Sequence, residues 1–167
     1  MRLHINWVGF LLLLSVGTAF SQESNPYVIL DSLKEKIEQV HDYRADIEIE
    51  VDVDFINIPV KHATMIYKAP DKVKFRSEGF FMVPKKGLNM PVREIMDQPY
   101  SAIYVGDDTL SGRLQHVIKV VPMTKKPDII LSTWWIDQET TLLSRSESST
   151  RDEGTFTVDF SYDDPAL

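Results

Sequence analysis

Five acidic side chains alternate with apolar ones in the stretch RADIEIEVDVDFI, which runs from residue 44 to residue 56. On a β-strand, side chains two positions apart share a face and lie about 6.6–7 Å from each other. Calcium needs about six to eight oxygens at about 2.3–2.6 Å, which a straight row of carboxylates cannot supply. We therefore expect these acids to face water, with a weak adventitious cation site as the alternative. The acids are Asp46, Glu48, Glu50, Asp52 and Asp54.

The other residues that could do chemistry do not form a catalytic or metal-binding set. The sequence has no nucleophile-elbow, zinc-protease, Cys-x-x-Cys, dinucleotide-binding or phosphate-loop motif. His62 and His116 fall in predicted strands without a His or Cys partner at metal-ligand spacing, so we expect surface or hydrogen-bonded histidines. Asp107 and Asp108 are typical turn formers and are expected in a hairpin turn. No enzymatic activity and no metal site are therefore predicted.

Composition restricts the class of protein further. The chain has 167 residues, no cysteine and a formal net charge of -7. This length suits one domain, because about 150 residues can bury roughly 70% of the surface of the unfolded chain. The acidic balance argues against nucleic acid, whose binding needs clustered Lys and Arg, and against simple adsorption to anionic membranes.

The N-terminal segment is typical of an export signal. Arg2 precedes an apolar run from Trp7 to Phe20, and Ala19 and Ser21 suit cleavage after Ser21. The run is shorter than the ~20 residues that a spanning helix needs. We predict a signal peptide over 1–21 and a single exported domain over 22–167, and the lack of cysteine excludes lipidation of a new N-terminal Cys.

The rest of the sequence predicts one helix and many strands. Asn25 and Pro26 can start an amphipathic helix that runs to about His41. The period then changes from 3.6 to 2, which indicates a mainly β (α+β) protein with one long antiparallel sheet. A short helix can start at Pro91 and reach Met96. Strands are predicted at 44–56, 60–68, 72–77, 101–106, 114–122, 128–137, 141–149 and 155–162, with turns at 57–59 and at GDDTLSG (106–112) among others.

The apolar face of this sheet must cover a core or line a cavity. The only cover besides the helix is GFFMVPKKGLNMPVREIM (79–96), which we interpret as a mobile lid because its Gly and Pro residues do not suit a core strand. For each candidate the alternative to ligand contact is core packing. One of Trp134 and Trp135 must point inward, and we place Trp134 among the candidates. The candidate ligand-lining residues are Val53, Phe55, Val73, Phe75, Phe80, Phe81, Met82, Leu88, Met90, Ile95, Met96 and Trp134.

Three segments together resemble the LolA/LolB-like outer-membrane lipoprotein-sorting family. They are GRLQHVIKVVP, LSTWWIDQETTLLSRSE and GTFTVDFSY, and YKAPDKVKFRSEG in the first half is similar to the family's strand turn. The resemblance covers roughly 28–162. The family's usual Asp-Gly-aromatic-Tyr strand pair is absent, and residues 79–96 stand in its place. The sequence stops at DDPAL, whereas family members commonly continue with further strands. This difference is what a shortened member or a fragment would show.

This resemblance implies a fold, a location and a ligand class. The implied fold is a strongly curved antiparallel sheet, an unclosed barrel, with helices that cover an apolar cavity. The implied function is carriage of acylated lipoproteins or lipids through a Gram-negative periplasm, as a monomer and without a cofactor. Partners could include inner- and outer-membrane sorting machinery, and no nucleic acid. The alternative is an envelope structural or sensing module of the same fold, with a filled core, that binds protein.

Overall fold

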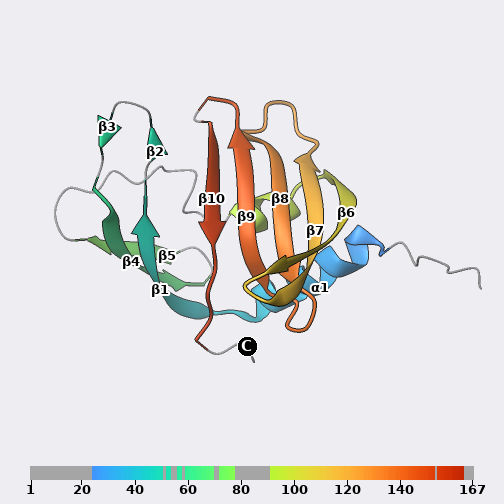
Figure 1. The fold of residues 1–167 in the computed structure, drawn as a ribbon, viewed down its shortest axis with the longest axis horizontal. Coiled ribbons are helices and arrows are strands. Elements are labelled where there is room, and N and C mark those ends of the chain that lie inside the picture. The colour runs from blue at the N-terminus through green and yellow to red at the C-terminus, as the bar shows by residue number, and fades with distance from the viewer. Residues whose placement is uncertain are drawn as a thin grey trace, which may run out of the picture.

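The computed structural model describes residues 24–50, 52, 53, 56, 57, 59–69, 72–77, 91–152 and 154–163 (Figure 1). Within these residues the protein is mainly β, with antiparallel strands, an N-terminal helix and no closed barrel, which confirms the predicted fold class. The helices are α1 (Pro26–Gln39) and α2 (Pro91–Met96). The strands are β1 (Asp42–Ile49), β2 (Asp52–Val53), β3 (Ile56–Asn57), β4 (Lys61–Lys68), β5 (Lys72–Ser77), β6 (Tyr100–Leu110), β7 (Arg113–Pro122), β8 (Ile129–Asp137), β9 (Leu143–Thr150) and β10 (Thr155–Asp159).

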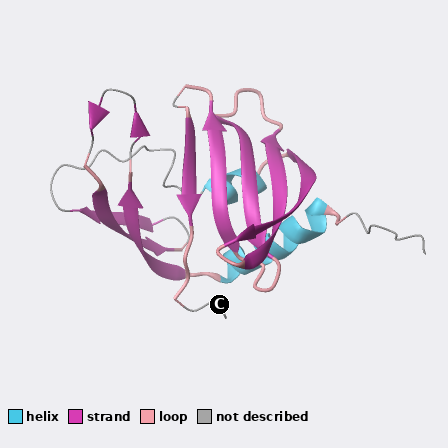
Figure 2. Cartoon of the chain, in the orientation of Figure 1, coloured by secondary structure: helices cyan, strands magenta, loops and turns pink. Residues whose placement is uncertain are grey.

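The described strands form two main sheets and a small ribbon, where the sequence predicted one long sheet. The larger sheet has five strands in the order β10-β9-β8-β7-β6, the second has three in the order β1-β4-β5, and β2 pairs with β3. Figure 2 shows the two main sheets side by side, with both helices on the same side of the five-stranded sheet. Strands β1 and β10 are the neighbouring edges of the two sheets in Figure 1.

Helix α1 forms where the sequence predicted it. The Asn25 side chain accepts a hydrogen bond from the backbone N–H of Tyr27 at 3.0 Å, and Pro26 occupies the first turn, where its missing N–H costs nothing. The helix ends before Val40, which has an extended backbone. Leu30 and Leu33 lie on the face that is fully buried against the sheet.

The hydrophobic core lies between the helices and the inner face of the five-stranded sheet. Trp134 on β8 is 0% exposed and packs with Ile118 and Val120 of β7. Helix α2 adds Val92, Ile95 and Met96 to the same cluster. Helix α2 therefore covers part of this core, beside α1.

Two predicted strand boundaries differ in the structure. Strand β1 ends at Ile49 rather than at the predicted 56, and the short β2–β3 ribbon lies between it and its partner β4 along the chain. Strand β6 continues through Asp107 and Asp108 to Leu110, so the turn is confined to Ser111 and Gly112, at the end of the predicted 106–112.

The backbone explains the second difference. Ser111 and Gly112 both have positive φ, at 51° and 79°, as a two-residue hairpin turn of the favoured hand requires. The ladder between β6 and β7 shifts register between Tyr104 and Gly106, which bends β6 without ending it. The turn preference of aspartate was therefore outweighed by this bulge and by the better turn at Ser-Gly.

The packing of α1 gives a first test. Leu33→Ala should lower the free energy of unfolding by about 2–5 kcal/mol, because Leu33 is 1% exposed and the cavity left behind cannot fill with water. Val28→Ala, on the same helix but 60% exposed, should change it by less than about 0.5 kcal/mol. Urea unfolding of both variants measures the difference, and similar losses would contradict the assigned helix face.

Candidate functional site

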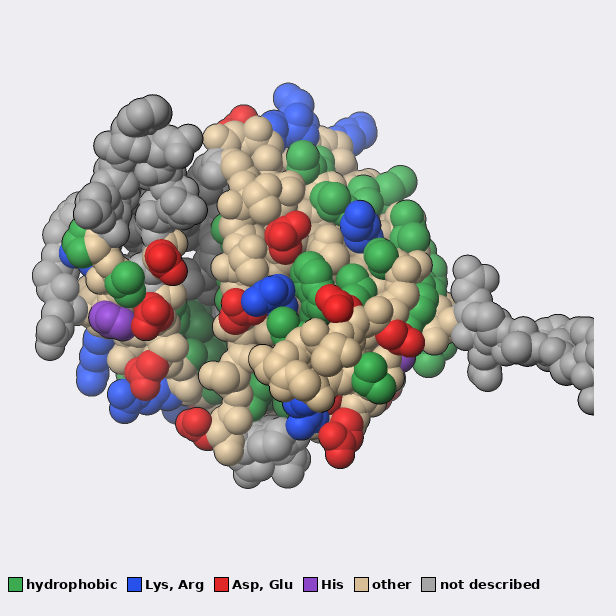
Figure 3. Space-filling model, in the orientation of Figure 1, with side chains coloured by type: hydrophobic (Ala, Val, Ile, Leu, Met, Phe, Trp, Pro, Cys, Tyr) green, Lys and Arg blue, Asp and Glu red, His purple; other side chains and the backbone are tan. Residues whose placement is uncertain are grey.

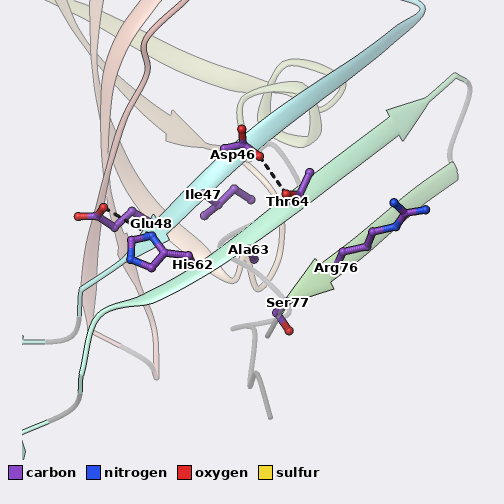
Figure 4. Close-up of a pocket in the computed structure, with 8 residues that line it drawn as sticks. All are labelled: Asp46, Ile47, Glu48, His62, Ala63, Thr64, Arg76 and Ser77. Atoms are coloured by element: carbon purple, nitrogen blue, oxygen red, sulfur yellow. Dashed lines mark hydrogen bonds and ion pairs between the residues drawn. The ribbon is translucent and has the colours of Figure 1, made fainter. Parts of the chain in front are cut away.

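An open hollow runs along the three-stranded sheet. Its volume is about 540 Å³, within the ~300–1,000 Å³ that small-molecule sites occupy. Its lining comes from β1, β4 and β5, and Figure 4 shows these side chains along the three strands. The lining residues are Asp46, Ile47, Glu48, His62, Ala63, Thr64, Arg76 and Ser77.

Strand register sorts this lining into rows on the two faces of the sheet. Ile47, Ala63 and Ser77 are direct cross-strand partners and share one face. Ala63 is 6% exposed and Ile47 is half-buried. Adjacent positions on a strand point to opposite faces, so Asp46, Glu48 and their partners lie on the other face. The hollow thus combines a small apolar row with a charged one.

The charged row contains part of the acidic series that the sequence singled out. The Thr64 hydroxyl donates to Asp46 Oδ1 at 2.9 Å, as Figure 4 marks. This hydrogen bond, together with the nearby Arg44, lowers the pKa of the exposed Asp46 carboxyl. Glu48 pairs with His62 at 3.7 Å between two exposed side chains. The described acids of this row face water as predicted, and no group of three or more His, Cys, Asp or Glu in the described residues is arranged to hold a metal ion.

The predicted ligand-lining residues lie in different places. Ile95, Met96 and Trp134 are buried in the core, at 4%, 7% and 0% exposure. Phe75 on β5 is half-buried and Val73 is exposed, and neither lines the hollow. The structure thus does not bring these five together, and their contact with a ligand stays a prediction. The side chains of Val53, Phe55, Phe80, Phe81, Met82, Leu88 and Met90 lie outside the described residues. Of the lid assigned to 79–96, residues 79–90 also lie outside them, and the described remainder is α2, whose Val92, Ile95 and Met96 pack in the core.

The two tryptophans occupy opposite faces of β8, as alternation predicted. Trp134 points into the core, and among the described residues its indole nitrogen has no hydrogen-bond partner. Trp135 faces outward, and its indole N–H donates to Asp108 Oδ2 at 3.0 Å. This bond fixes the bent end of β6 over the outer face of the five-stranded sheet.

An aromatic and cationic cluster joins the three-stranded sheet to α2. Arg93 Nη1 donates to the Tyr67 hydroxyl at 2.6 Å, and the Tyr43 and Tyr67 rings stack with centroids 5.0 Å apart. Burial, followed by the neighbouring Tyr67, raises the pKa of Tyr43 to about 12, so its hydroxyl stays neutral. Sequence reasoning missed this cluster, although Tyr43 directly precedes one of the two predicted pairing strands and Tyr67 lies near the end of the other.

A second polar cluster lies where β6 bends. Asp107 Oδ1 accepts from the Tyr104 hydroxyl at 2.5 Å and from Gln138 Nε2 at 2.6 Å. His116 Nδ1 lies 3.1 Å from the Tyr104 oxygen and 3.3 Å from Asp107 Oδ1. His116 is therefore a hydrogen-bonded histidine, as the sequence indicated. The cluster ties the bulged strand to the end of β8.

A charge pair ties the β6–β7 hairpin to the end of β8. Arg113 donates to both carboxylate oxygens of Asp137, at 2.5 and 2.8 Å, and the Asp137 side chain is 4% exposed. Asp137 Oδ1 also accepts from the backbone N–H groups of Glu139 and Thr140. The hydrogen bond from the Arg113 guanidinium is the main reason that the pKa of Asp137 lies well below its usual range, and the backbone amide of Thr140 lowers it further.

The Asp137 pair predicts a pH-dependent stability. Arg113→Met should cost about 1–3 kcal/mol at pH 7, because the buried carboxylate loses its charged donor but keeps two amides. A lowered pKa gives stability that is complete above the ordinary Asp value of about 3.9 and is lost as the pH falls toward the folded value. Denaturation of wild type and variant from pH 7 to pH 2 should therefore show the difference shrinking in acid. A constant difference would contradict the pairing.

Comparisons with known proteins found similar structures but no matching family. No protein-family model matches the sequence, and a search of curated proteins found no match. The structure is similar to an outer membrane lipoprotein-sorting protein domain from Vibrio parahaemolyticus, with 16% identity, coverage of 81% of this chain and 77% of that chain, and a TM-score of 0.48. A DUF1329 family protein from Desulfovibrio piger gives 11% identity, 78% and 76% coverage, and a TM-score of 0.42.

A third similar structure comes from the complex of the CwlD amidase with the GerS lipoprotein of Clostridioides difficile. It has 9% identity, covers 83% of this chain and 95% of that chain, and has a TM-score of 0.28. The Vibrio protein bears the description of the family that the sequence resembles. All three TM-scores are below 0.5, so a function for this chain is proposed from its own residues.

The acidic row provides a further test. Glu48→Gln combined with Glu50→Gln should shift the free energy of unfolding by less than about 0.5 kcal/mol and leave lipid binding intact, because both side chains are exposed. Thermal melts and calorimetric titration with calcium check this expectation. A tight calcium site, or loss of lipid binding in the variant, would show that the row does more than face water.

Proposed function

We propose that this protein binds the acyl chains of lipids or lipoproteins and carries them in the outer-membrane lipoprotein-sorting process. The observation that supports the proposal is the separation between a filled core under the five-stranded sheet and an open hollow of about 540 Å³ on the other sheet. The helices that fill the first core leave Ile47 and Ala63 beside open space. An apolar chain that covered the half-buried Ile47 would gain about 25 cal/mol for each Å² of apolar surface removed from water.

The proposed place of action is the periplasm, reached by export and removal of residues 1–21. No helix of the described residues is both long enough and apolar enough to cross a membrane. Action by binding, without a catalytic step, fits the clusters around Asp107 and Asp137, where each carboxylate already accepts several hydrogen bonds within the fold. An acylated lipoprotein, a lipid and the sorting machinery of the two membranes are the proposed partners.

A matched pair of variants tests the hollow. Ile47 and Ile66 are both half-buried on neighbouring strands, but Ile47 lines the hollow beside Ala63, whereas Ile66, which pairs with Arg44, is not among the residues that line it. Ile47→Glu should weaken binding of a fluorescent fatty acid to delipidated protein by about ten-fold or more, because a charge would replace apolar contact. Ile66→Glu should leave binding within about two-fold of wild type.

Native mass spectrometry of the protein purified from cell envelopes gives an independent readout. Wild type should carry lipid or an acylated peptide, and Ile47→Glu should carry less. Equal binding by both variants would place the ligand elsewhere. A wild-type protein that takes up no acyl chain would favour a protein-binding module with a filled core.

A further inference from the structure

The outer face of β6 and β7, opposite the core, exposes an unusual set of side chains. Ile103, Val105 and Met123 are 58%, 54% and 64% exposed. Lys119, Lys125 and Lys126 are also exposed. We call these six residues the β6–β7 patch. Figure 3 shows hydrophobic side chains gathered over the β6 and β7 side of the molecule, with basic side chains among and above them.

Backbone pairing makes the patch continuous. Ile103 and Lys119 are direct partners across the β6–β7 ladder. Tyr104 and Ile118, one position along each strand, pack in the core, so Ile103 and Lys119 must point away from it. The Met123 N–H donates to the Pro99 carbonyl at 2.8 Å and so holds Met123 at the end of the same ladder. Lys125 and Lys126 follow in the loop to β8.

The patch is poorly suited to adding a strand from a protein partner. β6 is an edge strand, and an unpaired edge would normally be open to such pairing. Here the Ala102 N–H already donates to the Tyr27 hydroxyl at 3.2 Å, and the bulge between Tyr104 and Gly106 interrupts the edge. What remains available is the side-chain face, which is apolar at its centre and basic at its end.

The charge of the patch is opposite to that of the whole protein. The chain has a net charge of -7, which by itself disfavours an anionic surface. The patch, however, contains three lysines and no acid. Asp128 is at the far end of the loop, where its backbone carbonyl accepts a hydrogen bond from the backbone N–H of Arg151 at 3.0 Å. Screening limits charge interactions to about 8–10 Å at ordinary salt, so this local charge governs contact at the patch.

We propose that the β6–β7 patch docks the protein onto an anionic lipid surface. Ile103, Val105 and Met123 would enter the boundary between headgroups and acyl chains, and the three lysines would lie against the phosphates. Apolar contact and lysine attraction together supply two signals, where one alone would give only marginal membrane binding. This docking does not depend on the proposed acyl carriage, because the patch and the hollow lie on different sheets.

Vesicle sedimentation tests the docking. Wild-type protein over 22–167 should sediment with vesicles of phosphatidylcholine and phosphatidylglycerol, less with phosphatidylcholine alone, and less as salt rises. Lys125→Gln combined with Lys126→Gln should weaken binding to the anionic vesicles about 25-fold, at about five-fold for each lysine. The control is Lys72→Gln combined with Lys74→Gln, an equal charge change on exposed residues of β5.

An apolar pair separates insertion from charge attraction. Ile103→Ser should lose binding, whereas Leu114→Ser, at an equally exposed residue (58%) outside the patch, should bind as wild type does. No binding of wild type to anionic vesicles, or equal losses in the variants and their controls, would overturn the proposal. A concentration-dependent dimer that Ile103→Ser dissociates would overturn it in favour of self-association. Fatty-acid uptake, measured on the same variants, reports on the hollow separately.

Discussion

The burial of one face of α1 against the five-stranded sheet is the interaction on which the rest of the fold depends. The chain has no cysteine, so no disulfide can supplement its core. Leu30 and Leu33 are fully buried on this face, and full burial of such a side chain contributes about 1.5–3 kcal/mol. They meet the inner face around Trp134, which is completely enclosed. Helix α2 closes the other part of the same core.

Because both helices cover one sheet, the other sheet has to be positioned by different means. The Arg93–Tyr67 hydrogen bond and the Tyr43–Tyr67 stack connect the three-stranded sheet to α2. These contacts lie at one end of the strands, around Tyr67 and Tyr43, which are paired residues of β4 and β1. The hollow lies further along, around Ile47 and Ala63. Its openness therefore follows from where the helices and the tyrosine cluster are placed.

Local sequence patterns predicted most of the elements. The Asn-Pro start of α1, the helix from Pro91 to Met96 and most strands depend on periodicity and capping within a few residues, and these agree with the structure. The turn at Asp107 and Asp108 was wrong because a bulge, a property of pairing with β7, outweighed the preference of aspartate for turns. The end of β1 at Ile49 was missed because the apolar alternation continues past it.

The candidate site was harder to predict than the fold. Alternation can assign Trp134 and Trp135 to opposite faces, but it cannot say whether an inward side chain meets a helix or open space. Trp134 and Ile95 meet the core, whereas Ile47 lies beside the hollow. That difference depends on how far two short helices extend over two sheets, which is a long-range property. The same holds for the β6–β7 patch, whose lysines are separated along the sequence.

The division into two sheets also has a consequence for cooperativity. Within the described part of the chain, the buried residues of the main hydrophobic cluster belong to the helices and the five-stranded sheet, and none to β1, β4 or β5. A unit with few buried apolar contacts opens more readily than the rest of a protein. The three-stranded sheet should thus form a separate, less stable folding unit. A molecule bound in its hollow would stabilise that unit by mass action and leave the larger unit nearly unaffected. Ligand occupancy would then be coupled to the order of one half of the protein.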